Sequence, residues 1–203
     1  YGNPVVAGGR IFVGTNNEGL KNPKITGDKG VLMCLRESDG AFLWQAIHDK
    51  LPAGRVNDWP EEGICSSPCV EGNRVYYVSN RCELVCADVD GFLDGKNDGL
   101  IQDEKYREKT DADFIWILDM YKDLSVFPHN MSTCSPVVYG GLVFVLTSNG
   151  VDEEDHSKLP QSEAPSFIAV DKDTGKVVWK DASPGKGILH GQWSSPSIGT
   201  FGG

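Results

Sequence analysis

The 203-residue sequence contains no apolar run of the roughly 18 residues that a membrane-crossing helix needs. Positive charge is also scarce, because 19 Lys and Arg stand against 29 Asp and Glu, which gives a net charge of -10. An acidic surface repels phosphate backbones. We therefore expect neither a membrane-spanning segment nor a nucleic-acid partner.

Motifs for nucleophilic or phosphate chemistry are absent as well: there is no G-x-S-x-G, no phosphate-binding glycine loop and no H-E-x-x-H. Six cysteines are present, and two pairs have the spacing C-x-x-x-C, at Cys65/Cys69 and Cys82/Cys86. On a strand such partners lie ~13 Å apart, which is too far for one zinc ion to bridge. We expect buried free thiols that act as small hydrophobic residues.

Glycine and proline are plentiful, with 24 and 11 residues, which favours many short strands. Three segments align on sight, beginning at Pro4, Pro68 and Pro136, and a fourth begins at Pro196. In each of the first three, an apolar run meets Gly-Gly or Gly-Asn and a second run rich in Val, Ile, Phe or Tyr follows. This pattern predicts a β-hairpin with a tight turn.

Each hairpin is followed by a second one that ends in a tryptophan, at Trp44, Trp116 and Trp179. Four antiparallel strands per repeat are typical of the blades of a β-propeller. Because a blade has two apolar faces, we expect the three indoles to be buried between neighbouring sheets. Cys34, Cys86 and Ala169 hold equivalent positions in the repeats, which predicts a small core site there.

The sequence therefore predicts an all-β fold, with three four-stranded antiparallel blades of a β-propeller plus the start of a fourth. The predicted partial domain covers residues 1–203, with blades at approximately 1–47, 64–120 and 132–181 and the next beginning at 193–203. Propellers typically have 4–8 blades. We expect the chain to be a fragment of a longer protein, with neighbouring blades of the ring as its partners.

The string Ala169-Val-Asp-Lys-Asp-Thr-Gly-Lys-Val-Val-Trp179 resembles the tryptophan-docking motif of the pyrroloquinoline-quinone-like propellers. These comprise quinoprotein dehydrogenases and non-catalytic relatives that include the propellers of outer-membrane protein assembly. The resemblance covers nearly the whole chain and implies a periplasmic or extracellular setting. It is specific for fold and weak for function.

Two functions agree with that resemblance. The first is a non-enzymatic scaffold that binds a protein or small ligand, without catalytic residues or a cofactor. The alternative is a fragment of a quinoprotein dehydrogenase, which the resemblance implies would hold pyrroloquinoline quinone with Ca²⁺ in the channel. We prefer the scaffold, because the sequence lacks the adjacent cysteine pair that many such enzymes carry near the quinone.

The long connections are predicted to gather at one end of the ring, and long loops on a rigid scaffold are where binding usually occurs. The connections that enter the inner strands carry polar and aromatic residues expected at the channel mouth, either as a binding site or as caps of strand ends. These candidates are Arg55, Asp58, Trp59, His129, Asn130, His190, Gln192 and Trp193. We expect the other two histidines, His48 and His156, at the surface.

A second candidate site is an acidic insertion in the middle repeat, where glycines separate Asp88, Asp90, Asp94 and Asp98. Calcium takes 6–8 oxygen ligands, and glycine permits the sharp turns of calcium loops. The spacing departs from the EF-hand, because Phe92 stands at a ligand position and Gly99 at the twelfth. Asp-Gly pairs are also ordinary turn formers, so a solvated turn is the alternative to a Ca²⁺ site.

Overall fold

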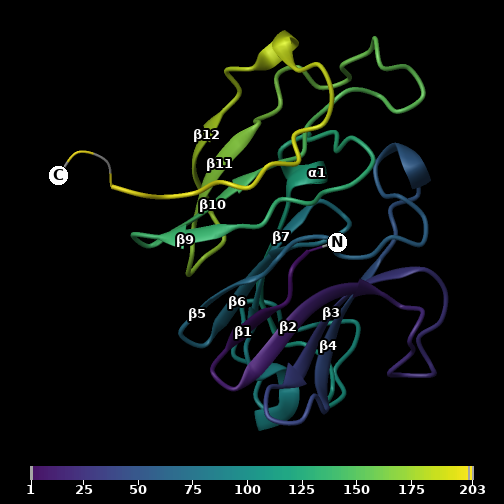
Figure 1. The fold of residues 1–203 in the computed structure, drawn as a ribbon, viewed down its shortest axis with the longest axis vertical. Helices are drawn as coiled ribbons and strands as arrows, with labels where there is room; N and C mark the ends of the chain where they lie inside the picture. Colours follow the sequence, from purple (N-terminus) through teal and green to yellow (C-terminus); the bar gives the residue numbers. More distant parts are fainter. Residues whose placement is uncertain (1, 201, 203) are drawn as a thin grey trace.

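The computed structural model describes residues 2–200 and 202 and is built from three antiparallel sheets of four strands each, in simple sequential order (Figure 1). The first sheet contains β1 (Val5–Ala7), β2 (Arg10–Asn16), β3 (Lys29–Arg36) and β4 (Phe42–Asp49). The second contains β5 (Cys69–Glu71), β6 (Arg74–Val78), β7 (Glu83–Asp88) and β8 (Phe114–Asp119). The third contains β9 (Val137–Tyr139), β10 (Leu142–Leu146), β11 (Phe167–Asp171) and β12 (Val177–Asp181). The predicted β-propeller blades are confirmed.

The repeat extends to the details of strand pairing. In every blade the register between the third and fourth strands shifts once, at a bulge. The bulge follows Cys34 in the first blade, Cys86 in the second and Ala169 in the third. These three residues are fully buried, and each pairs with the tryptophan of its own blade. The predicted small core site is therefore correct, and burial raises the pKa of the Cys34 and Cys86 thiols to about 12.

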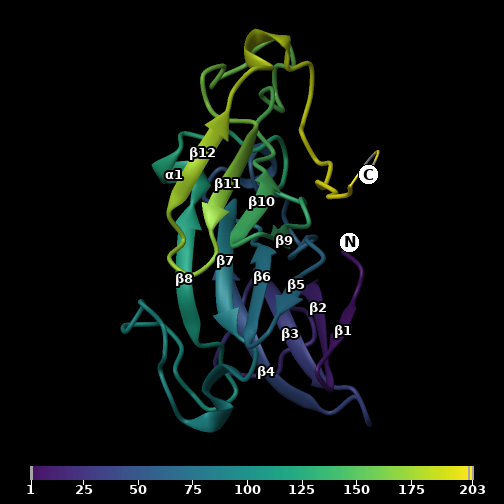
Figure 2. The same cartoon turned by 90° about the vertical axis from the view of Figure 1, so that its left-hand side faces the viewer.

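The blades pack face to face along the long axis of the molecule, from β1–β4 at one end to β9–β12 at the other (Figure 1, Figure 2). The middle sheet is buried on both faces because its strands are apolar at successive positions. Val75, Tyr77 and Val85 belong to the core shared with the first sheet, and Tyr76 and Leu84 to the core shared with the third.

Two of the three tryptophans dock onto the next blade as predicted. The buried Trp44 indole donates a hydrogen bond to the Val89 carbonyl at 3.0 Å, and the Trp116 indole donates to the Lys172 carbonyl at 2.9 Å. Trp179 differs from the prediction, because it is 39% exposed. In the described residues no further sheet lies against the outer face of the third blade, so this indole has no docking partner there.

Short helical turns interrupt the connections: η1 (Gly54–Val56), η2 (Gly91–Asp94), α1 (Met120–Asp123) and η3 (Gly185–Gly187). Figure 2 shows the insertion between β7 and β8, residues 89–113, projecting beyond the end of the middle blade. None of the helices in the described residues is long and apolar enough to cross a lipid bilayer. Residues 193–200 of the predicted fourth blade have no assigned strand, and 201 and 203 lie outside the described residues.

Candidate functional site

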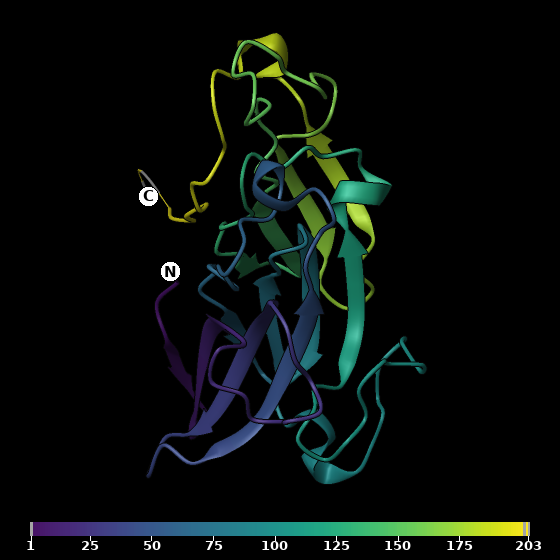
Figure 3. The same ribbon diagram turned by 90° about the vertical axis from the view of Figure 1, so that its right-hand side faces the viewer.

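Three connections that enter or follow a blade meet at one place: residues 50–68, 120–136 and the chain after β12 (Figure 3). The Trp59 N–H donates to the Asn130 carbonyl at 2.9 Å, and the Asn130 N–H donates to the Val56 carbonyl at 3.0 Å. The Trp193 indole donates to the His129 carbonyl at 3.1 Å. Hydrogen bonds to backbone carbonyls therefore join segments that lie more than sixty residues apart in the sequence. We name this region the junction surface: Arg55, Trp59, His129, Asn130, Met131, Thr133, His190 and Trp193.

An open apolar hollow lies in the junction surface, with a volume of about 370 Å³. It is lined by Trp59, Asn130, Met131, Thr133 and Trp193. Trp193 is 38% exposed, so its ring is available to a ligand while its N–H is already satisfied. Indoles held in this way offer apolar contact area at a low cost in conformational entropy.

A charged group borders the hollow on the Trp59 side. The Arg55 guanidinium lies 4.1 Å from the centroid of the Trp59 ring, within the range of a cation–π interaction. Arg55 also lies 3.7 Å from a carboxylate oxygen of Glu153, on the β10–β11 connection. The arginine therefore links the hollow to a neighbouring polar cluster.

Asp58, a predicted ligand-binding residue, does not line the hollow. Its carboxylate is buried, lies 2.5 Å from the Lys50 ammonium and accepts hydrogen bonds from the Leu51 backbone and the Asn80 amide. Burial raises the pKa of Asp58 even though the Lys50 charge opposes that change. Asp58 therefore caps the end of β4. This is the second of the two roles predicted for residues of the connections, a cap of a strand end in place of a binding residue. Gln192 is half-buried, and its side-chain oxygen has no hydrogen-bond partner.

Of the two histidines expected at the surface, His156 is exposed as predicted, whereas His48 is not. His48 is buried, with one ring nitrogen 3.0 Å from a Glu83 oxygen and the other 2.8 Å from the Tyr77 hydroxyl. The cause is that β4 packs against the middle sheet, so its alternate residues point into the interface. His156 is exposed, but its ring lies against those of His129 and His190, with centroids 5.2 Å from each.

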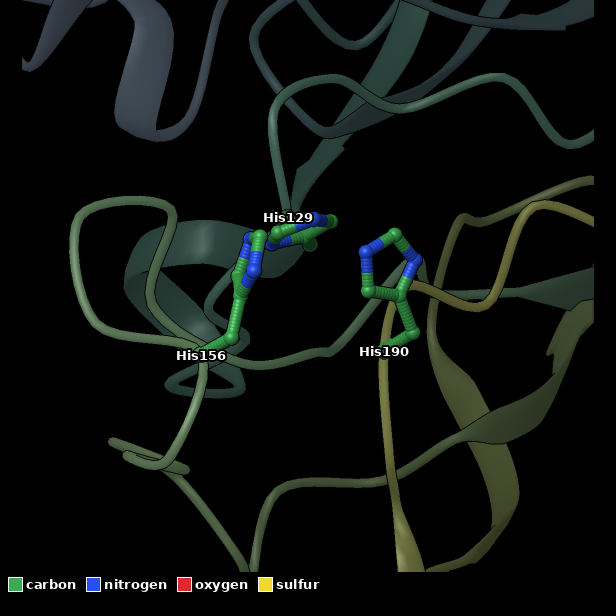
Figure 4. A group of neighbouring side chains, drawn as sticks. All are labelled: His129, His156 and His190. Carbon is green, nitrogen blue, oxygen red and sulfur yellow. The ribbon is translucent and has the colours of Figure 1, made fainter.

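His129, His156 and His190 therefore form one cluster, and Figure 4 shows the three rings turned toward a common space from three separate segments. The His129 and His190 centroids are 4.4 Å apart. Burial, reinforced by the neighbouring His190 and His156, lowers the pKa of His129. The sequence placed His129 and His190 at one channel mouth but did not add His156, because His156 comes from a loop within the third blade and the other two come from connections that flank it.

The acidic insertion does not gather its aspartates. Asp88 pairs with Arg74 at 2.6 Å and Asp94 with Lys96 at 2.9 Å, while Asp90 pairs with Arg10 of the first blade. The Asp98 backbone donates to Asp113. Across residues 2–200 and 202, the only group of three or more potential ligands near one another is the histidine cluster. Three of the four aspartates thus each pair with a different basic residue.

The same observation bears on the quinone and Ca²⁺ implied by the dehydrogenase alternative. Calcium prefers oxygen ligands, whereas the ligand group that the described part of the chain brings together consists of imidazole nitrogens. The histidine cluster itself therefore does not fit a calcium site.

Two solved structures of known proteins share this fold. A search of curated protein sequences finds no match. Among solved structures, a europium-containing methanol dehydrogenase is similar, with 14% identity and a TM-score of 0.53 over 87% of this chain and 23% of the other. The quinohemoprotein alcohol dehydrogenase from Comamonas testosteroni is also similar, with 14% identity and a TM-score of 0.53 over 88% of this chain and 20% of the other. BamB from Moraxella catarrhalis has 13% identity and a TM-score of 0.43 over 85% of this chain and 33% of the other.

The likenesses to the two dehydrogenases concern the fold alone. The chain spans a fifth to a third of the length of the three structures. A family model, by contrast, matches residues 28–199, which include all but the first strands of the first blade. Its description is "Outer membrane protein assembly factor BamB". Together with the repeated blades, the shared bulge and the docked tryptophans, this match shows that the chain belongs to the BamB family of pyrroloquinoline-quinone-like β-propellers.

Proposed function

We propose that this chain is a non-enzymatic propeller scaffold that binds a protein ligand at the junction surface. The observation that carries the proposal is the apolar hollow between Trp59 and Trp193, formed where three connections meet. Its volume of about 370 Å³ lies within the ~300–1,000 Å³ typical of ligand sites.

The composition of the hollow favours an extended polypeptide with aromatic or apolar side chains as the ligand. Trp and Arg are enriched among the residues that dominate binding energy in protein interfaces, and methionine adapts its shape to different partners. Here Arg55, Trp59, Met131 and Trp193 occur together. The family description, an outer-membrane protein assembly factor, supports the same kind of ligand and a periplasmic or extracellular setting.

The test uses a fluorescein-labelled peptide of alternating aromatic and polar residues, the pattern of a membrane β-barrel strand. Fluorescence anisotropy measures its dissociation constant for the chain and for Trp59→Ala and Trp193→Ala. If each indole contributes as an interface anchor, we expect a loss of about 2 kcal/mol, or roughly 30-fold in affinity.

The matched control is Tyr139→Ala, which removes an exposed aromatic side chain from β9 that does not line the hollow. Affinity that is unchanged in both tryptophan variants, or lost equally in the tyrosine control, would contradict the proposal. Dye-linked alcohol oxidation by the chain loaded with pyrroloquinoline quinone and Ca²⁺ would instead favour the dehydrogenase alternative.

A further inference from the structure

We propose that His129, His156 and His190 bind a divalent transition-metal ion, Zn²⁺, with Glu153 as the fourth ligand. One ring nitrogen from each histidine lies within 4.8 Å of the other two (Figure 4). This inference is independent of the ligand proposed for the hollow.

The buried histidine, His129, presents an open ring nitrogen to the cluster. The Nδ1 atom of His129 lies 2.7 Å from the Val151 carbonyl, which accepts hydrogen bonds only, so Nδ1 carries the proton. In the neutral ring the lone pair is then on Nε2. That atom is buried and has no hydrogen-bond partner. An Nδ1–H bonded to a backbone carbonyl with Nε2 left open is the usual arrangement of a metal-ligating histidine.

A carboxylate, that of Glu153, lies beside the rings. Glu153 Oε2 lies 3.8 Å from His129 Nε2 and 3.3 Å from His156 Nε2. The His156 Nε2 atom hydrogen-bonds to that oxygen when it carries the proton. The His129 Nε2 lone pair and the carboxylate oxygen are both acceptors, so they repel each other unless a positive charge lies between them. A bound cation supplies that charge and uses the imidazole lone pairs at the same time.

Glu153 is itself held in place by neighbouring polar groups. The Asn130 amide, turned so that its nitrogen faces these acceptors, donates to Glu153 Oε2 at 2.9 Å and to the Arg55 carbonyl at 3.2 Å. Arg55 lies 3.7 Å from the other carboxylate oxygen. Asn130 has a positive φ of 64°, a conformation that asparagine tolerates better than most residues. Outer contacts of this kind orient a ligand and raise metal affinity.

The segments can approach closely because Gly150 lies between them. A Cβ atom at this position would stand 2.6 Å from the His190 carbonyl oxygen and 2.7 Å from the His129 Cβ. The absence of a side chain allows the β10–β11 connection to pass against both histidines. Gly150 is therefore a positioning residue for the cluster.

The donor set selects the ion. Imidazole nitrogens with one carboxylate suit zinc and its first-row neighbours, whereas calcium and magnesium prefer oxygen alone. In a tetrahedral zinc site with bonds of about 2.0–2.1 Å, ligand atoms are about 3.3 Å apart. Because His156 and His190 are exposed, small rotations of their side chains can close the present separation.

Bound zinc would join three segments: the connection before β9, the β10–β11 connection and the chain after β12. Trp193 packs on the same cluster, with its ring centroid 5.5 Å from that of His129 and 5.2 Å from that of His190. The ion would therefore fix one wall of the junction surface.

The experiment is calorimetric titration of the metal-stripped full chain, produced without a polyhistidine tag, with ZnCl₂. We expect one ion per chain. His156→Ala and His190→Ala change exposed side chains. Loss of an outer contact of a metal ligand weakens metal affinity about 10- to 100-fold, so loss of a ligand itself should weaken zinc binding by at least that factor in each variant. Circular dichroism checks that both variants fold.

Glu153→Gln should weaken zinc binding by a similar factor, and Glu154→Gln, the exposed neighbour, is its matched control and should bind as the unmodified chain does. Substitution of Co²⁺ should give the visible absorption of a four-coordinate nitrogen–oxygen site, which the histidine variants lose. Absence of a saturable one-to-one heat with Zn²⁺, or equal affinity in His156→Ala and His190→Ala, would overturn the proposal.

Discussion

Replacing Trp116 with alanine tests how the blades are held together. The indole is 3% exposed, lies between the second and third sheets, and donates its N–H to the Lys172 carbonyl at 2.9 Å. A Cβ atom on Gly175 would come within 2.8 Å of its ring, so the indole and this glycine of the third blade are in close contact. Truncation therefore leaves a cavity in the blade interface and an unpaired carbonyl.

The expected loss follows from that environment. Truncation of a buried tryptophan to alanine costs about 3–5 kcal/mol, a large part of the ~5–15 kcal/mol that stabilises a typical domain. Trp179 occupies the same position in the third blade but is 39% exposed, with no sheet over it in the described residues. Since water fills the vacated space there, Trp179→Ala loses only partial burial, about 1–2 kcal/mol.

Urea unfolding followed by far-UV circular dichroism gives both free energies from the midpoint and slope of each variant's own transition. The midpoint should fall clearly further for Trp116→Ala than for Trp179→Ala, with similar slopes. Equal losses in the two variants would refute the idea that docking onto the next blade is what stabilises the repeat.

Two further predictions concern the blade interfaces. Burial of Glu83 opposes ionisation, but the hydrogen bond and charge of His48 outweigh it and lower the Glu83 pKa from 4.5 to about 2. This pair therefore stabilises the fold above about pH 4.5 and loses that contribution as the pH falls toward 2. Urea unfolding at pH 5 and at pH 3 gives the free energy of unfolding at each pH, and the difference between the two values should be smaller for Glu83→Gln than for the unmodified chain. Gly175 has a φ of +71°, and a Cβ atom there would meet the Trp116 ring, so Gly175→Ala should lower the free energy of unfolding by about 1–3 kcal/mol. Gly8 has a φ of +55° but faces open space, so Gly8→Ala should lower it by about 1 kcal/mol. Equal melting temperatures for the two glycine variants would contradict the close packing described for the indole.

The sequence by itself determined the blades, because their signals are local and repeated. Two-residue glycine turns, strands of alternating or continuous apolar residues, and a tryptophan at the end of each repeat act within some forty to fifty residues. The equivalence of Cys34, Cys86 and Ala169 could be read from alignment of the repeats, and the structure places all three at the same bulge.

Only the tertiary structure decided which polar residues meet. His48 had no visible partner in the sequence, since Glu83 and Tyr77 reach it from another sheet. Asp58 is a buried cap because Lys50 and Asn80 converge on it. Such contacts depend on how one blade is rotated against the next, which no local pattern encodes.

The histidine cluster shows the same limit at the candidate site. His129 and His190 were expected near the channel mouth, but His156 and Glu153 join them only because the β10–β11 connection passes against both flanking segments at Gly150. Hydrophobic periodicity fixes the strands, and the course of the long connections is then set by the few backbone and side-chain hydrogen bonds that satisfy their polar groups. Several of those bonds join residues more than sixty positions apart, so the site exists only in the folded chain.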